Sequence, residues 1–417
     1  MSVSALRIDR FLRQGSYWLL FMLALTVPSL DQPSRSIALL LLLAVFARCL
    51  LPGTLLLREL DIYDYSLIAL ALAALLSTVF GLPSSGRYHG LAEALGHLVT
   101  FVAIRHGHYS NRMLQKLGAA LVAGTVIAGI LALHAYFSHQ VWPISLPAIT
   151  GTIRSSLYIG IALFLAIGLI LEDQGTRRWI LLAAALFLAV ILLSMTSRAV
   201  IVAFVSVLIL AAAVSHRRRT FLLLGTITGI LFAAYFAMPE SNIKKQIDLK
   251  ANEMMGLVTS GTVSDNDRIR IDHWRIALAW IETGNHWLFG VGPRNFRSID
   301  TDKLQFTPPL YFPAETREPL HAHNMYLTKY VEEGLVGLAT MLALFALIAW
   351  RLLLDALAKR TSWAWWGALG GLLLPCTNGM VGSPWFREYA LLATLTFGLY
   401  LAVRGSTSNS NLNLGQS

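Results

Sequence analysis

The chain of 417 residues contains few charged residues: Asp, Glu, Lys and Arg together make up 13% of it, whereas hydrophobic residues make up 56%. A soluble domain normally contains about 25% charged residues. This shortage leaves too little polar surface to cover soluble domains of this total length, so the composition argues against two or three ordinary soluble domains. The apolar surface must instead face lipid.

Cysteine is also scarce, because Cys49 and Cys376 are the only two in the sequence. The predicted topology places them near opposite membrane faces, about 30 Å apart, which is far beyond the reach of a disulfide. The sequence has no Cys-x-x-Cys pair and no Cys/His spacing typical of a zinc site. We therefore expect no disulfide and no cysteine-based metal site. We expect no metal ion or cofactor, although the neighbouring carboxylates of Asp265 and Asp267 keep a divalent-cation site open.

What the chain does contain is a repeat of apolar stretches of about 20 residues, each long enough to cross a bilayer as a helix. We predict an all-α, polytopic membrane protein of about twelve transmembrane helices. The span at 91–105 departs from the pattern because it contains Glu93 and His97. The predicted spans are 16–30, 37–52, 66–82, 91–105, 117–137, 154–171, 179–194, 199–215, 220–238, 333–354, 362–378 and 388–403.

The net charge of +10 comes largely from Lys and Arg in short loops on one side of the predicted bundle. Because cytoplasmic loops are enriched in these residues, that side is predicted to be cytoplasmic, together with both termini. The run His216–Arg219 fits this explanation as a topology anchor. The same distribution argues against nucleic acid as a partner, since the basic residues follow the topology and not a binding surface.

One long polar segment, 239–332, interrupts the repeat and by parity lies on the outer side. It divides the chain into nine spans in 1–238, the loop 239–332, three spans in 333–403 and a Ser/Asn-rich tail, 404–417, that is predicted to be disordered. Residues 267–282 have apolar residues at helical spacing, which predicts a helix inside the loop. A loop of this length in a compact chain is usually functional.

Several arginines are predicted on the outer face near the lipid boundary. Arg198 lies in a very short turn between two spans, and Arg154 begins another span. Arg268 and Arg270 open the loop helix, with Arg275 further along it. Arginine binds phosphate through a planar, permanently charged fork, so this set suits a diphosphate. The alternatives are that the boundary cations simply extend to the lipid headgroups and that neighbouring aspartates pair with Arg268 and Arg270.

A pair of histidines, His321 and His323, lies just before a predicted span and is followed by Asn324. Histidines at i and i+2 could bind a metal, but no third ligand follows at a suitable spacing. A histidine on the outer face is better placed to deprotonate a hydroxyl group. The string Gly290–Pro293 is interpreted as a tight turn after a helix, and Gly334 and Gly337 as sites of close helix packing.

These residues resemble the motifs of bacterial O-antigen ligases, within the wider family that includes O-antigen polymerases and protein O-oligosaccharyltransferases. Their order and spacing carry the resemblance more than any one of them. The matching features are Thr196-Ser197-Arg198, Arg270 four residues before Trp274, the turn Gly290–Phe296, and His323-Asn324 followed by Gly334 and Gly337.

The resemblance implies an all-helical, GT-C-like glycosyltransferase with a large periplasmic loop in the bacterial inner membrane. It implies transfer of O-antigen from undecaprenyl diphosphate to lipid A-core by an inverting, metal-independent mechanism. Carried over by motif, His323 would be the general base, and Arg198 and Arg270 would bind the diphosphate, with Arg268 and Arg154 as helpers. His321, Asn324 and Arg275 are secondary candidates.

Three other functions remain open from the sequence. An O-antigen polymerase would use the same donor but extend another carrier-linked chain. A protein oligosaccharyltransferase usually has a further soluble domain, whereas a short polar tail follows the last span here. A lipid-linked sugar transporter without chemistry would place its polar groups along a path through the bundle, whereas here they gather at one face.

Overall fold

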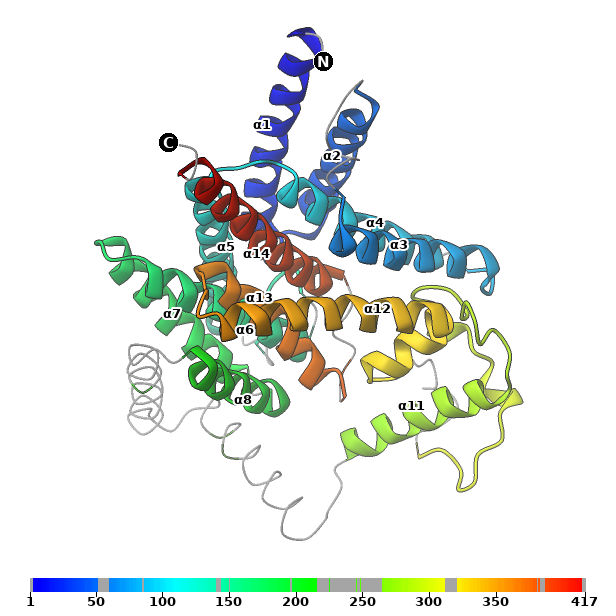
Figure 1. Ribbon diagram of the computed structural model, residues 1–417. Coiled ribbons are helices and arrows are strands. Elements are labelled where there is room, and N and C mark those ends of the chain that lie inside the picture. Colours follow the sequence, from blue (N-terminus) through cyan, green and yellow to red (C-terminus); the bar gives the residue numbers. More distant parts are fainter. Residues whose placement is uncertain are drawn as a thin grey trace.

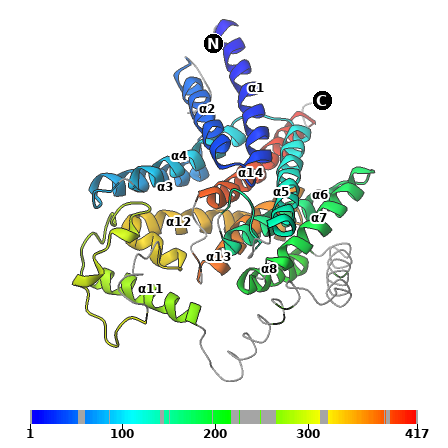
Figure 2. The same cartoon turned by 180° about the vertical axis from the view of Figure 1, so that it is seen from behind.

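The computed structural model describes most of the chain. The described residues are 3–51, 60–84, 86–139, 144–149, 151–195, 197–215, 225, 245, 248, 265–311, 321–380, 382 and 387–414. Within these ranges the fold is all-α without β-strands, as predicted. The helices are α1 (Val3–Thr26), α2 (Asp31–Leu50), α3 (Ile62–Phe80), α4 (Gly86–Arg105), α5 (Asn111–His139), α6 (Thr152–Glu172), α7 (Arg177–Ser194), α8 (Arg198–Ser215), α11 (Asp265–Glu282), α12 (Met325–Leu357), α13 (Trp363–Asn378) and α14 (Arg387–Leu414), with 3-10 helices η2 (Phe296–Ser298) and η3 (Thr301–Lys303) (Figures 1 and 2).

The protein is a multi-pass membrane protein. In the described part of the chain, five helices are long and apolar enough to cross a bilayer, namely α3, α5, α6, α7 and α12. Shorter apolar helical stretches occur at Ser36–Leu50, Val200–Ala211 and Tyr389–Gly405. The predicted span 220–238 lies outside the described residues, so the total of about twelve stays a prediction.

Helix α6 lies at the centre of the bundle and is buried continuously from Ser155 to Ile170. Helix α13 packs across it, and the contact depends on small residues that let the two backbones approach. A Cβ atom at Gly168 would lie 2.2 Å from the carbonyl oxygen of Trp363, and one at Gly370 would lie 2.7 Å from Cβ of Phe164. Side chains larger than hydrogen would therefore separate the two helices.

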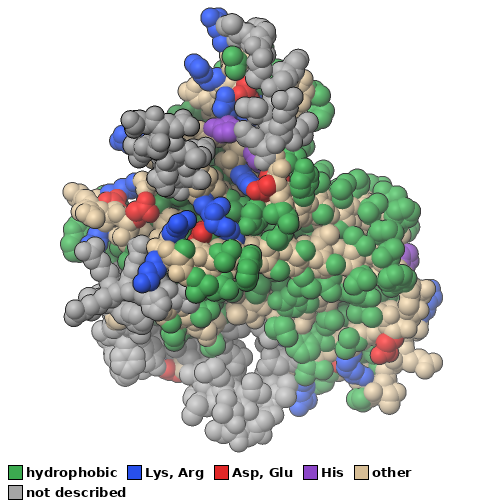
Figure 3. Space-filling view, viewed as in Figure 1, with side chains coloured by type: hydrophobic (Ala, Val, Ile, Leu, Met, Phe, Trp, Pro, Cys, Tyr) green, Lys and Arg blue, Asp and Glu red, His purple; other side chains and the backbone are tan. Residues whose placement is uncertain are grey.

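Helices α3 and α12 present hydrophobic side chains to the outside, and Figure 3 shows a broad hydrophobic area over them. Exposed examples are Leu72 and Val79 on α3 and Leu342 and Trp350 on α12. Such an area would be unfavourable in water but is the expected surface of a helix that faces lipid.

A sharp kink divides α12 at Gly334, whose φ of 68° lies in the left-handed region that favours glycine. The kink frees backbone groups, and the turn after α11 satisfies them. The amides of Val291 and Gly292 donate to the carbonyls of Val331 and Glu332 at 2.9 and 2.8 Å. On the other side of the kink, the amide of Leu335 donates to the carbonyl of Trp287 at 2.9 Å.

This arrangement refines the sequence interpretation of the two glycines and of the turn. Gly290–Pro293 does form a turn after a helix, as predicted. Gly334, however, accommodates the backbone of that turn and not another helix, since a Cβ atom there would lie 2.3 Å from the carbonyl carbon of Leu288. The turn and the kink thus interlock at the start of α12.

Two predicted boundaries differ from the structure. Helix α12 begins at Met325, inside the segment assigned to the loop 239–332, because Asn324 caps it there. Helix α14 continues to Leu414, whereas the tail 404–417 was predicted to be disordered. Once an apolar segment has nucleated a helix, each added residue costs little, so Ser and Asn can extend it.

Ion pairs join the helix ends on the predicted cytoplasmic side. Arg48 at the end of α2 contacts Asp9 of α1 at 3.1 Å. Arg105 at the end of α4 contacts Asp61 and Asp64 at the start of α3, the latter at 2.7 Å. His106 contacts the same Asp64 at 2.9 Å. We call this set of residues the basic-end network.

Candidate functional site

Helix α11 lies beside the first turns of α12, held by a small hydrophobic core of its own (Figure 1). Ile276 and Ala277 of α11 are fully buried there against Val291, Phe296 and Val331. The spacing of the apolar residues along α11 is helical, so one face packs inward and the residues on that face are fixed in register. The predicted loop helix 267–282 is thereby confirmed.

Asn324 fixes the segment that carries the two predicted histidines. Its side-chain oxygen accepts hydrogen bonds from the amides of Tyr326 and Leu327 at 2.9 and 3.0 Å, which caps α12. Its side-chain nitrogen donates to the carbonyl of Met380 at 3.2 Å. Asn324 therefore acts on the backbone, as a cap and an anchor.

The neighbouring residues hold the same segment from the other side. The amide of Ala322, between the two histidines, donates to Oγ1 of Thr328 at 3.2 Å, and Ala322 is fully buried. His323 has a φ of 49°, a left-handed conformation that costs about 1 kcal/mol or more in a non-glycine residue. Such conformations persist where the surroundings impose them, and they gather at functional sites.

Three histidine rings, of His273, His321 and His323, form one group, which we call the histidine group. The ring of His323 stacks on that of His273 with 5.1 Å between centroids and 11° between planes. The ring of His321 also contacts that of His323, with 4.3 Å between centroids and 45° between planes. His273 comes from α11, so the group joins the loop helix to the segment before α12.

Burial and positive charge keep these histidines neutral. Desolvation, helped by the other two histidines and by the cations of Arg270 and Arg154, lowers the pKa of His323 to about 3. Desolvation and Arg154 likewise lower the pKa of His321 to about 4, and burial lowers that of His273. Two predicted arginines from separate elements, α6 and α11, therefore act on the histidine group.

The other predicted arginines are placed differently. The guanidinium of Arg268 lies over the ring of Tyr311, 5.4 Å from its centroid. Arg275 pairs with Asp272 at 3.1 Å and donates to the carbonyls of Pro308 and Pro309, so it ties the following loop to α11. Arg198 begins α8 as expected, but its side chain lies outside the described part of the structure.

Sequence reasoning missed His273. The residue follows Arg270 by three positions, so the two share a face of α11. It also lies in register with the buried Ile276 and Ala277. The sequence did contain a signal for His273, because it is a polar residue on the apolar face of a helix that also presents an arginine.

The arrangement combines a neutral base with a positive field. Each histidine that is neutral at pH 7 has a ring nitrogen able to accept a proton. The two arginines favour an anion beside that nitrogen, and a bound anion would raise the basicity of His323 by offsetting their charge. A hydroxyl group that loses its proton next to a phosphate ester fits both features.

Comparison with known proteins points the same way. Residues 182–342 match the O-antigen ligase family, a segment that includes Arg198, Arg270, His273 and His323 but not Arg154. No curated protein matches the chain. Together with the all-helical fold and its membrane spans, this partial match supports an O-antigen ligase or polymerase family member; proteins of that family are glycosyltransferase-like membrane enzymes.

Proposed function

We propose that the protein is an O-antigen ligase. It transfers O-antigen polysaccharide from undecaprenyl diphosphate to a sugar hydroxyl of lipid A-core at the periplasmic face of the inner membrane. The observation that carries the proposal is that a neutral His323 stands within the field of Arg270 and Arg154. The family match supports the substrate class, a lipid-linked polysaccharide and lipid A-core.

In the proposed reaction, His323 accepts the proton of the attacking hydroxyl. The hydroxyl oxygen forms a bond to the anomeric carbon of the donor from the side opposite the diphosphate, so the configuration inverts. The bond between the anomeric carbon and the phosphate oxygen breaks, and its electron pair leaves with undecaprenyl diphosphate. His323 later releases the proton to water.

The arginines stabilise the negative charge that develops on the leaving diphosphate. Arg270 and Arg154 act from α11 and α6, and Arg198 and Arg268 are proposed as further contacts. A preorganised cation aimed at developing charge is usually among the largest contributions to catalysis. Because arginine can supply this charge, the proposed mechanism requires no metal ion.

The low pKa of His323 also has a consequence for the order of events. Without a ligand, a base whose pKa is about 3 accepts a proton poorly at pH 7. Binding of the diphosphate offsets the charges of Arg270 and Arg154, so the pKa of His323 rises when the donor is in place. The bound donor therefore makes His323 a stronger base, although burial, the main cause of its low pKa, stays in place.

The test is a reconstituted assay with purified protein, undecaprenyl-diphosphate-linked O-antigen, lipid A-core and excess chelator. We expect O-antigen on lipid A-core. Growth of the carrier-linked chain without transfer to lipid A-core would assign the protein as a polymerase. If neither product forms, the proposal fails and a transporter is favoured. A product that forms only with a metal ion would contradict the proposed mechanism.

A further inference from the structure

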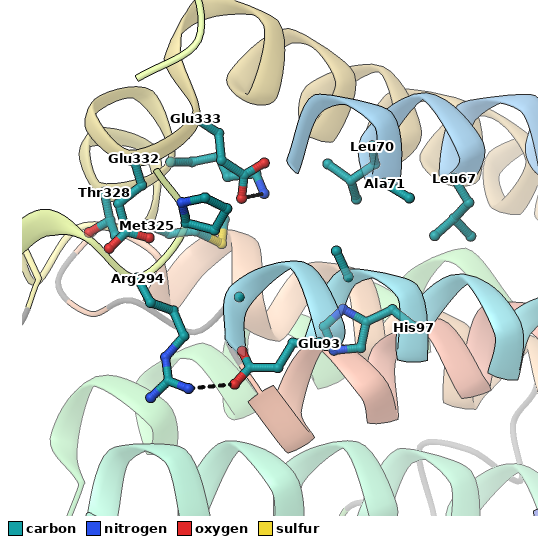
Figure 4. Close-up of a pocket in the computed structure, with 14 residues that line it drawn as sticks. Leu67, Leu70, Ala71, Glu93, His97, Arg294, Met325, Thr328, Glu332 and Glu333 are labelled. Carbon is teal, nitrogen blue, oxygen red and sulfur yellow. Dashed lines mark hydrogen bonds and ion pairs between the residues drawn. The ribbon is translucent and has the colours of Figure 1, made fainter. Parts of the chain in front are cut away.

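A pocket separate from the histidine group lies between α3, α4 and the start of α12 (Figure 4). We call it the α3–α4–α12 pocket. Its lining combines an apolar wall from α3, namely Leu67, Leu70 and Ala71, with ionisable groups from the other elements. The ionisable residues of the lining are Glu93, His97, Arg294, Lys329, Glu332 and Glu333.

The cations of this pocket are matched to carboxylates. Arg294 contacts Glu93 at 2.9 Å, the contact drawn in Figure 4, and Lys329 contacts one oxygen of Glu333. The lining contains three acidic residues, Glu93, Glu332 and Glu333, and two cations. A phosphate would therefore meet cations that are already paired with carboxylates, which disfavours an anionic ligand.

One acceptor atom of the side chains that line the pocket has no hydrogen-bond donor in the described structure. Glu333 is 6% exposed, and its Oε2 atom is buried without a hydrogen-bond partner in the described structure. A buried carboxylate oxygen without a donor is costly, so a ligand that supplies a donor gains the corresponding energy on binding. Hydroxyl and amino groups are the donors that fit.

The pocket is built by close backbone packing. Glu332 is held through its carbonyl, which accepts from Oγ of Ser77 at 2.6 Å, while its carboxylate accepts from the amide of Phe296 at 3.4 Å. A Cβ atom at Gly90 would lie 2.4 Å from Cβ of Pro293, so α4 lies directly on the turn after α11. A preformed pocket of this kind binds a ligand without a large cost of ordering.

The first turn of α12 connects the pocket to the histidine group. Met325 and Thr328 line the pocket, and Oγ1 of Thr328 accepts the hydrogen bond from the amide of Ala322, between the two histidines of the loop. Glu93 lies seven residues along α4 from Gly86, about 10 Å at 1.5 Å per residue. The pocket thus extends from near this end of α4 into the bundle, since His97, further along α4, also lines it.

We propose that the α3–α4–α12 pocket is a sugar-binding subsite that holds a sugar ring of one glycolipid substrate through hydrogen bonds from its hydroxyl groups to Glu333. Carboxylates accept hydrogen bonds from sugar hydroxyls, and the leucines of α3 can cover the apolar face of the ring. The identity of the ligand as a glycolipid rests on the proposed function. The sugar can belong to the donor or to the acceptor, and the experiment distinguishes the two.

The test measures binding without turnover, in nanodiscs, on a His323→Ala background. The three ligands are undecaprenyl-diphosphate-linked O-antigen, lipid A-core and sugar-free undecaprenyl diphosphate. Glu333→Gln keeps the shape of the side chain but removes the charged acceptor. Glu282→Gln, at an exposed carboxylate of α11, is the matched control.

We expect Glu333→Gln to raise the Kd of one of the two glycolipids by about tenfold, the effect of losing a hydrogen bond to a charged group, and to leave sugar-free undecaprenyl diphosphate unchanged. Weaker binding of the O-antigen donor places the donor sugar in the pocket, and weaker binding of lipid A-core places the acceptor sugar there. Ala71→Leu, which narrows the pocket from α3, should weaken the same ligand.

Unchanged binding of both glycolipids in both variants would overturn the subsite. An equal loss for sugar-free undecaprenyl diphosphate would also overturn it, because the pocket would then respond to the diphosphate. Binding of neither glycolipid by the His323→Ala background alone would contradict the proposed function itself. The failures of the two proposals are therefore distinguishable.

Discussion

The basic-end network and the histidine group contain the same residue types, arginine and histidine, in different electrostatic settings. In the basic-end network, Arg105 and His106 face the buried carboxylate of Asp64, so opposite charges are matched within the protein. In the histidine group, Arg270 and Arg154 act on neutral histidines and oppose their protonation. The buried ion pairs hold helices together, whereas the cations of Arg270 and Arg154 add to burial in opposing protonation of His323, an effect that a bound anion would offset.

The largest expected effect is on the base itself. His323→Ala should reduce transfer about a thousandfold, because the attacking hydroxyl loses its proton acceptor. The protein should remain inserted and monodisperse. His89→Ala, at an exposed histidine of α4, should retain activity. Rates from the reconstituted transfer assay check this. Normal activity of the His323→Ala protein would show that His323 is not the general base.

The next effect concerns the positive field. Arg270→Ala should reduce transfer about a hundredfold, the usual cost of removing one stabilising contact to a developing anion. Arg270→Lys should be little more active than Arg270→Ala, since the point charge of lysine does not replace the guanidinium fork.

Arg268 provides the comparison on the same helix. Because its guanidinium lies over Tyr311, Arg268→Lys should lose less activity than Arg270→Lys. Steady-state rates at varied donor concentration measure both variants. Equal losses would show that the two arginines contribute alike and that the position of Arg270 beside the histidines is unimportant.

The matched network predicts the opposite pattern. Asp64→Asn should lower stability by about 2 kcal/mol, because Arg105 and His106 lose the buried carboxylate that they share, while Arg105 keeps its contact with Asp61. The transfer rate of the protein that remains folded should change little. Thermal unfolding in nanodiscs, together with activity per folded molecule, checks this. A specific loss of activity without loss of stability would show that the two regions are coupled.

The smallest expected effect concerns His273, which we interpret as a positioning residue for His323. His273→Ala should lower kcat about tenfold, because the stacked ring that orients His323 is lost. His273→Phe should recover most of this loss, since it keeps a ring to stack on. If both variants lose activity equally and the acid side of the kcat profile shifts, the imidazole itself takes part in proton transfer.

Much of the fold follows from the sequence, because long apolar stretches leave helices as the only way to satisfy the backbone in lipid. The stretch with Glu93 and His97 does form a helix, α4. Its charge is explained by Arg294, which lies far away in the sequence and could not be paired with Glu93 in advance. The kink at Gly334 could not be predicted from the sequence either, because it depends on the packing of the turn after α11 against the start of α12.

The sequence predicted single residues of the site better than the contacts that bring them together. The motifs identified His323, Arg270 and Arg154, and the structure brings these together. The motifs ranked Arg270 above Arg275, but they could not show that Arg275 ties the following loop to α11, which depends on tertiary contacts such as those of Arg275 with Pro308 and Pro309. They also missed His273, whose role depends on a ring contact across 50 residues of sequence.

We infer that the surroundings of His323 keep this residue neutral until an anion binds. The most direct measurement is an NMR titration of the histidine rings in isotope-labelled protein, with and without undecaprenyl diphosphate, using His323→Ala to assign the signal. We expect a pKa far below 6.5 without ligand, near the value of about 3, and a clear rise when the diphosphate binds. A pKa near 6.5 that does not respond to undecaprenyl diphosphate would contradict the account.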